Sequence, residues 1–187
     1  VRSICDWLDL SSSNVTVARG ADEGIDCLMR AFCIPAVDNI IICPPTFAMY
    51  AQSALLQGVE VRKVPLADDF GLDTSGIMAA VDGNTKMVFV CSPNNPTANL
   101  MDSDTVAGLC TAMSGRALVV VDETYIDYAD ADSMATEMER FENLVVLRTL
   151  SKSHAAAGLR CGVTVARADV TELLQKVLAP YPVPQPV

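Results

Sequence analysis

Short apolar runs alternate with amphipathic stretches along almost the whole chain of 187 residues. Runs such as NIIIC and ALVVVDET are of strand length and rich in β-branched residues, which is typical of strands that are buried on both faces. Stretches such as ADEGIDCLMRAF place apolar residues at the spacing of an amphipathic helix. This alternation predicts an α/β domain with three α/β/α layers and a mostly parallel sheet.

The individual elements follow from the apolar runs and from the glycines and acidic residues that separate them. We expect strands at residues 15–20, 39–43, 59–66, 86–93, 117–124, 143–151 and 161–166. We expect helices at residues 21–32, 46–58, 73–83, 102–115 and 167–178, with a further helical stretch around 133–141.

Charge and cysteine usage exclude several classes of partner. The formal net charge is −10, and an acidic body repels the phosphate backbone of nucleic acids. No apolar run has membrane-spanning length, and no signal or transit peptide is visible. The seven cysteines form no C-x-x-C pair and accompany a single histidine, which predicts free thiols in a reducing compartment and no metal site.

Polar and aromatic residues follow the predicted strands. Ligands of such sheets bind beyond the carboxyl ends of the strands, so we expect these residues to line one cleft. They supply what pyridoxal 5'-phosphate needs: a lysine for a Schiff base, a carboxylate for the pyridine nitrogen, donors for the ring oxygen, an aromatic plate and a phosphate cup. The candidates are Lys152, Asp122, Asn95, Tyr125 and Phe47, with Gly20, Ala21, Asp22, Ser151 and Arg160 for the cup.

The same segments carry a resemblance to a known family. SPNNPTAN, VVDETYIDY and TLSKSHAAAGLRCG resemble the motifs of fold-type I, pyridoxal-phosphate-dependent aminotransferases. RGADEGIDCLMRAF, CPPTFAMY and LAPYPVPQPV narrow the resemblance to the histidinol-phosphate aminotransferase family, a class II branch. The resemblance covers about residues 14–187, and its motifs occur in the family's order.

The resemblance implies a role for each matching residue. Lys152 would form the Schiff base with the cofactor and carry the proton, Asp122 would pair with the pyridinium nitrogen, and Tyr125 would be the third catalytic residue. Tyr125 and Asn95 would both donate to the ring oxygen. Phe47 would stack on the ring. The phosphate would lie by Ala21, Asp22, Thr149, Ser151 and Arg160.

The resemblance also implies an activity, partners and a domain organisation. The reaction would be amino transfer between L-histidinol phosphate and 2-oxoglutarate in histidine biosynthesis, by a homodimer in the cytoplasm, or in the plastid of a plant or alga. Residues 1–180 would be the large cofactor-binding domain without its N-terminal arm, and residues 181–187 would begin the link to a small C-terminal domain. The alternatives are an aromatic aminotransferase, a threonine-phosphate decarboxylase, or a truncated domain that binds the cofactor without turnover.

Three positions depart from the family's pattern. Ala98 replaces the glycine of the usual N-P-T-G, and it would cost about 1 kcal/mol if the backbone there has positive φ. Phe47 stands where tyrosine is frequent, and His154 stands where an aromatic or apolar residue is common.

Other aromatic residues receive no functional role from the sequence. We interpret Tyr50 and Tyr128 as structural, Tyr181 as part of the proline-rich link, and Trp7 as core.

Overall fold

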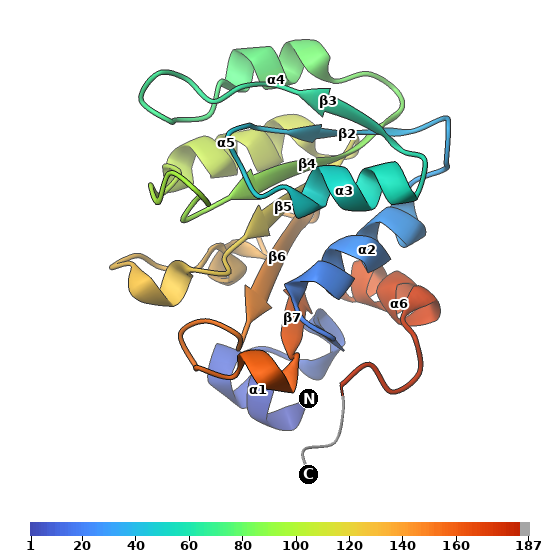
Figure 1. Ribbon diagram of the computed structural model, residues 1–187, viewed down its shortest axis with the longest axis vertical. Coiled ribbons are helices and arrows are strands. Elements are labelled where there is room, and N and C mark those ends of the chain that lie inside the picture. The colour runs from blue at the N-terminus through green and yellow to red at the C-terminus, as the bar shows by residue number, and fades with distance from the viewer. Residues whose placement is uncertain (184–187) are drawn as a thin grey trace.

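A computed structural model, which describes residues 1–183, contains one seven-stranded sheet in the order β1-β7-β6-β5-β4-β2-β3 (Figure 1). Strands β2 to β6 run parallel to one another, whereas β7 is antiparallel to both β1 and β6. The prediction of an α/β fold with a mostly parallel sheet is therefore confirmed. The strands are β1 (Val15–Ala18), β2 (Asn39–Ile42), β3 (Glu60–Lys63), β4 (Thr85–Cys91), β5 (Leu118–Asp122), β6 (Leu144–Thr149) and β7 (Gly162–Val165).

Helices cover both faces of this sheet. Two separate buried clusters show the division, because one contains residues of α2, α3 and α6 and the other contains residues of α1, α4 and α5. In Figure 1, α2, α3 and α6 lie together along one side of the sheet. The helices are α1 (Arg2–Leu8), α2 (Ala21–Phe32), α3 (Met49–Leu56), α4 (Thr74–Ala80), α5 (Ser103–Met113) and α6 (Ala168–Val177).

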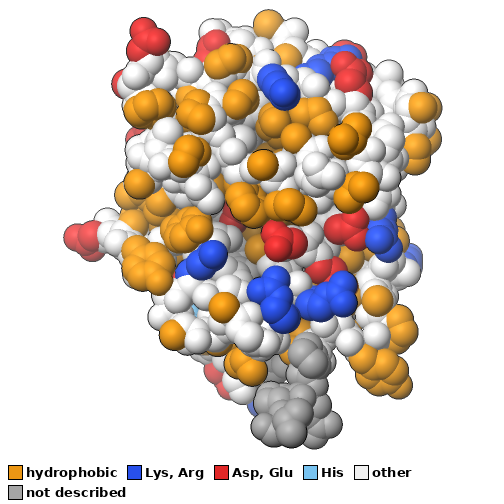
Figure 2. All heavy atoms as spheres, in the orientation of Figure 1, with side chains coloured by type: hydrophobic (Ala, Val, Ile, Leu, Met, Phe, Trp, Pro, Cys, Tyr) orange, Lys and Arg blue, Asp and Glu red, His pale blue; other side chains and the backbone are white. Residues whose placement is uncertain are grey.

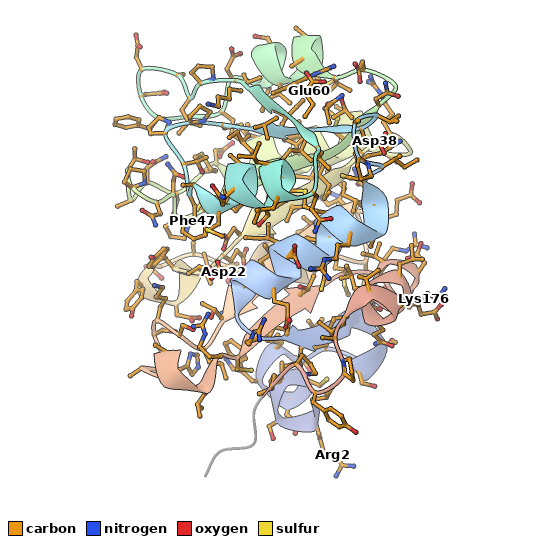
Figure 3. The ribbon with its side chains drawn as sticks, turned by 45° about the vertical axis from the view of Figure 1, so that its right-hand side comes forward. Arg2, Asp22, Asp38, Phe47, Glu60 and Lys176 are labelled. Carbon is orange, nitrogen blue, oxygen red and sulfur yellow. The ribbon has the colours of Figure 1, made fainter. Side chains whose placement is uncertain are left out.

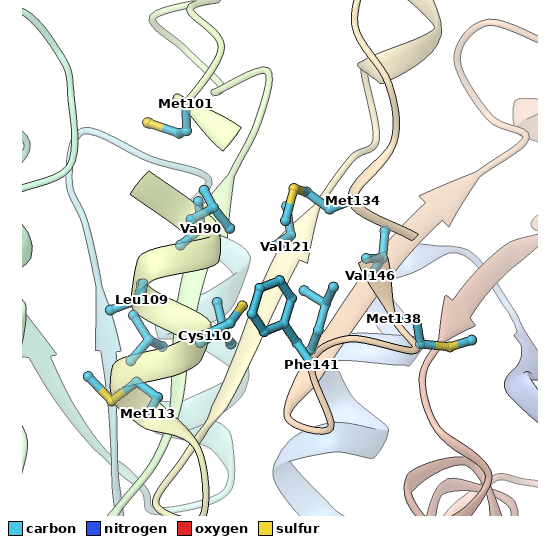
Figure 4. Close-up of a cluster of buried hydrophobic side chains, with 14 of the residues drawn as sticks. Val90, Met101, Leu109, Cys110, Met113, Val121, Met134, Met138, Phe141 and Val146 are labelled. Atoms are coloured by element: carbon cyan, nitrogen blue, oxygen red, sulfur yellow. The ribbon is translucent and has the colours of Figure 1, made fainter. Parts of the chain in front are cut away.

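The continuous apolar strands supply both clusters. Successive side chains of a strand point to opposite faces, so Val119 and Val121 of β5 pack in the α5 cluster while Val120 packs in the α2 cluster. Figure 4 shows the first cluster, where α5 presents Leu109 and Met113 to the sheet. This explains why the inner strands β2, β4, β5 and β6 lack the alternation of apolar and polar residues that a half-exposed sheet would need.

The structure corrects two expectations from the sequence. The helical stretch around 133–141 is reduced to one 3-10 turn, Met134–Glu137. The backbone N–H groups of Met138 and Arg140 donate to carbonyl oxygens three residues back, not four, which is the tighter 3-10 pattern. Trp7 is not a core residue, since 36% of its surface is exposed.

Two further observations concern the chain as a whole. Within residues 1–183, no helix has both the length and the apolar character needed to cross a bilayer. The predicted link at 181–187 is described only as far as residue 183, so residues 184–187 lie outside the described part of the chain.

Candidate active site

One cleft lies at the carboxyl ends of the parallel strands, as sheet topology requires. It encloses about 530 Å³, part of it open to solvent. All ten cofactor residues predicted from the sequence line it: Ala21, Asp22, Phe47, Asn95, Asp122, Tyr125, Thr149, Ser151, Lys152 and Arg160. In Figure 3, Asp22 at the start of α2 and Phe47 just before α3 lie on the same side of the molecule. Gly20, also a candidate for the phosphate cup, lines the cleft as well, and Cys91 and Thr124 complete its walls.

Asp122 is the last residue of β5 and forms the floor of the cleft. Only 3% of its surface is exposed. One carboxylate oxygen accepts hydrogen bonds from the Thr124 backbone N–H (3.0 Å) and hydroxyl (2.6 Å), and the other accepts from the Tyr50 hydroxyl at 2.7 Å. Burial raises the pKa of Asp122, while these hydrogen bonds lower it. A cationic ring nitrogen placed beside this carboxylate would favour its charged form.

Tyr50 is the residue that sequence analysis missed. It is fully buried in α3, its ring stacks on Phe89 with centroids 4.7 Å apart, and it meets Phe47 edge-on at 5.6 Å. Burial holds the pKa of its hydroxyl well above the usual tyrosine value, so the hydroxyl stays a donor to Asp122. A signal was present, because Tyr50 comes three residues after Phe47 and would share its side of the helix expected at residues 46–58.

Lys152 and Tyr125 face one another at the mouth of the cleft. The Lys152 ammonium lies 5.5 Å from the centre of the Tyr125 ring, within the range of a cation–π contact. Lys152 has no ion-pair partner in the part of the chain that the structure describes. An exposed amine that no carboxylate holds can reach an aldehyde carbon in the cleft, which a Schiff-base lysine has to do.

The other end of the cleft is suited to an anion. Helix α2 spans twelve residues and opens at Ala21 after Gly20, whose φ is +83°, so its N-terminus presents free backbone N–H groups. Arg160 lies beside it, with Nη1 3.5 Å from the Ser151 hydroxyl and Nη2 3.9 Å from Asp22. Figure 2 shows basic and acidic side chains gathered close together across the lower half of one face.

Two glycines bring this helix end close to Arg160 and the sheet. A Cβ on Gly20 would come within 2.7 Å of an Arg160 nitrogen. A Cβ on Gly162, at the start of β7, would come within 2.1 Å of the Gly20 carbonyl carbon. Only residues without side chains allow the α2 N-terminus, the arginine and the strand end to meet.

Thr149 lines the cleft but its hydroxyl is already engaged. It donates to the Cys161 carbonyl at 3.3 Å and accepts from the Ser151 N–H at 3.2 Å. Thr149 therefore fixes the start of the segment that carries Ser151 and Lys152.

Ala98, which replaces the glycine of the usual N-P-T-G, has the positive φ that would make this replacement costly. Its φ is +62°, the left-handed region that glycine occupies at least cost. Its N–H donates to the Asn94 carbonyl at 2.7 Å, which closes the turn. The neighbouring Asn95 lines the cleft, so this strained turn delivers a predicted cofactor residue.

The arrangement fits a ligand with an aromatic ring, a ring nitrogen and a phosphate. Phe47 offers a flat apolar surface, Asp122 a buried carboxylate, and Arg160 with the α2 N-terminus an anion cup. Lys152 lies within reach of a ring substituent. The chemistry of these donors matches pyridoxal 5'-phosphate, and it defines the class of protein as one built to hold that cofactor.

The chain belongs to the class I and II aminotransferase family, whose model matches residues 2–187. Enzymes of this family use pyridoxal 5'-phosphate. Among curated proteins, the histidinol-phosphate aminotransferase of Yersinia enterocolitica is 49% identical over 181 residues, which are 97% of this chain and 48% of that protein. The enzyme of the same name from Vibrio cholerae strain O395 is 49% identical over 187 residues, which are 100% of this chain and 54% of that protein.

Solved structures show the same fold. The aspartate aminotransferase of Thermotoga maritima superposes with a TM-score of 0.84 at 27% identity, over 94% of this chain and 49% of that one. The histidinol-phosphate aminotransferase of Clostridium acetobutylicum gives 0.87 at 22% identity, over 97% and 54%. The chain thus spans about half the length of the relatives it matches.

Proposed function

We propose that the protein is a pyridoxal-phosphate-dependent transaminase that converts L-histidinol phosphate and 2-oxoglutarate into imidazole acetol phosphate and glutamate. The observation that carries this proposal is the convergence of all ten predicted residues on one cleft. The choice of substrate is supported by the identity of 49% to enzymes named histidinol-phosphate aminotransferase. The seven free thiols support a cytoplasmic location, and a homodimer remains part of the proposal.

The residues would divide the work as follows. When bound, the cofactor supplies the electron sink for amino transfer. Asp122 would keep the ring nitrogen protonated through its buried carboxylate, whose direction Tyr50 and Thr124 fix. Phe47 sets the plane of the ring. Lys152 would take a proton from the substrate carbon that carries the amino group and return it to the cofactor carbon on the other side of the nitrogen.

The anion cup would anchor the phosphate of the cofactor. Arg160 can bind two phosphate oxygens at once, while Ser151 and the N–H groups that begin α2 bind others. Tyr125 and Asn95, which line the same cleft, would donate to the ring oxygen. These contacts hold the ring while the substrate exchanges.

An assay with defined substrates tests the proposal. The purified protein with pyridoxal 5'-phosphate should form glutamate from L-histidinol phosphate and 2-oxoglutarate, and Lys152→Ala should abolish this. Lys176→Ala is the matched control, because Lys176 is an exposed lysine on α6, away from the cleft. Glutamate formed from phenylalanine but not from L-histidinol phosphate would favour an aromatic aminotransferase, and release of CO₂ from threonine phosphate would favour a decarboxylase.

A further inference from the structure

Arg148 is a buried cation that the proposed chemistry does not use. It lies in β6 among apolar residues, and its side chain is only 6% exposed. Its Nη1 is 3.8 Å from an oxygen of Glu123, and its Nη2 donates to Oδ1 of Asp127 at 2.5 Å. A buried charge persists only where it is paired, so the position of Arg148 fixes the position of both acids.

Asp127 links Arg148 to the segment that carries Lys152. We call this segment the lysine loop (residues 150–156). While Oδ1 of Asp127 binds Arg148, its Oδ2 accepts a hydrogen bond from the Ser153 hydroxyl at 2.5 Å. Ser153 directly follows Lys152. The same hydroxyl lies 2.9 Å from Nδ1 of His154, so His154 is joined to this carboxylate through Ser153.

The segment that carries Tyr125 is held at both ends by the same guanidinium. Glu123 precedes Tyr125 by two residues and Asp127 follows it by two. Glu123 is 2% exposed, and burial raises the pKa of its carboxyl while Arg148 lowers it. Glu123 also accepts from the backbone N–H of Met134 at 2.6 Å, which fastens this segment to a third part of the chain.

Trp7 closes the cluster from outside. Its ring lies 5.0 Å from the Arg148 guanidinium carbon and 4.9 Å from the His154 ring, edge-on. This packing explains why Trp7 is partly exposed instead of sitting in the core. It connects α1 to the lysine loop and shields the Arg148 charge from water, which strengthens the pairing with Asp127.

We infer that Asp127, held by Arg148, is a positioning residue. It fixes Lys152 by its hydrogen bond to the neighbouring Ser153, and it fixes Tyr125 because it lies two residues further along the same backbone segment. This inference rests on the proposed function, because it assigns a task to residues behind the same cleft. Neither Arg148, Asp127 nor Ser153 lines the cleft, so their effect reaches a bound molecule only through Lys152 and Tyr125.

Hydrogen exchange of the lysine loop in the cofactor-free protein tests the link directly. The reporters are the amides of Ala155, which donates to the Lys152 carbonyl, and Ala156, which donates to the Leu150 carbonyl. Asp127→Asn and Ser153→Ala should each speed their exchange roughly ten-fold, as expected for the loss of one hydrogen bond to a charged group. The double variant should add little, because both changes weaken the same contact between residues 127 and 153.

Asp132→Asn is the matched control for charge. Asp132 is exposed, five residues along the same segment, and has no ion pair within residues 1–183. Hydrogen exchange of the lysine loop in the Asp132→Asn variant should equal that of the unmodified protein. Unchanged exchange in both Asp127→Asn and Ser153→Ala, or an equal effect of Asp132→Asn, would overturn the inference.

Kinetics of the protein with cofactor separate positioning from binding. Asp127→Asn should lower kcat about ten-fold and leave KM for the amino donor within about two-fold, because the cleft walls are intact while Lys152 is misplaced. A rise in KM at constant kcat would contradict the inference. If the unmodified protein shows no transaminase activity, the proposed function fails, whereas the exchange experiment still decides whether Asp127 holds the loop.

Discussion

Replacing Tyr50 by phenylalanine isolates the hydrogen bond that orients Asp122. The change removes one oxygen from a fully buried side chain and leaves its stacking on Phe89 and its edge contact with Phe47 intact. Asp122 then keeps only its two bonds from Thr124. A hydrogen bond to a charged group contributes about 1.5–3 kcal/mol, so the free energy of unfolding of the cofactor-free protein should fall by about that amount at neutral pH.

The loss should depend on pH in a defined direction. The Tyr50 hydroxyl lowers the pKa of Asp122, because it stabilises the carboxylate more than the neutral acid. Its extra contribution is therefore present above the folded-state pKa of Asp122 and disappears as the pH falls through it. At about pH 4 the difference between the two proteins should shrink to the 0.5–1.5 kcal/mol or so of a neutral hydrogen bond.

Urea unfolding with linear extrapolation measures both values. Tyr128→Phe is the control, since Tyr128 is 67% exposed and its change should stay within about 0.5 kcal/mol. A Tyr50→Phe effect below about 0.5 kcal/mol at pH 7, or one that does not vary with pH, would refute the reasoning that this hydroxyl serves a buried carboxylate.

Three further substitutions test other parts of the site. Ala98→Gly should stabilise the protein by about 1 kcal/mol in urea unfolding, because φ is +62° and the methyl group is exposed; a loss would mean that the turn is not strained. Gly162→Ala should destabilise the folded protein by about 1–3 kcal/mol and weaken the binding of pyridoxal 5'-phosphate, because the added Cβ would clash with the Gly20 backbone. An unchanged affinity for the cofactor, measured by titration of its absorbance, would argue against the proposed phosphate cup. Burial raises the pKa of Asp122, so its contribution to stability is full below the ordinary aspartate pKa and falls as the pH rises through the folded value. In the absence of cofactor at pH 7, Asp122→Asn should therefore unfold at no lower urea concentration than the unmodified protein. It should nevertheless bind the cofactor at least ten-fold or so more weakly. A large loss of stability would contradict the expectation about unfolding.

The fold was predictable because its determinants are local. The inner strands β2, β4, β5 and β6 are mostly apolar runs, and α2 begins and ends at the residues that its apolar spacing indicates. The turn at Met134–Glu137 was not predictable, because Met134, Met138 and Phe141 are buried in one cluster at the spacing of a helix face, and this spacing does not show that the segment forms only one 3-10 turn.

The residues that line the cleft were predictable, but the residues behind them that hold them in place were not. Residues such as Lys152 and Arg160 follow strands, so sheet topology alone sends them to one edge. Tyr50 and Arg148 act through side chains far away in the sequence, at separations of 72 and 21 residues from their acidic partners. No periodicity encodes such pairings, and the structure was needed to find them.

Trapping of the cofactor on the chain tests the central claim most directly. The purified protein is mixed with pyridoxal 5'-phosphate and reduced with borohydride, and the modified peptide is identified by mass spectrometry. The structure predicts a pyridoxyl group on Lys152, with much less of it in Asp122→Ala or Arg160→Ala and an unchanged amount in Lys176→Ala. An adduct spread over exposed lysines such as Lys63 and Lys176, with no preference for Lys152, would contradict the assignment of the cleft.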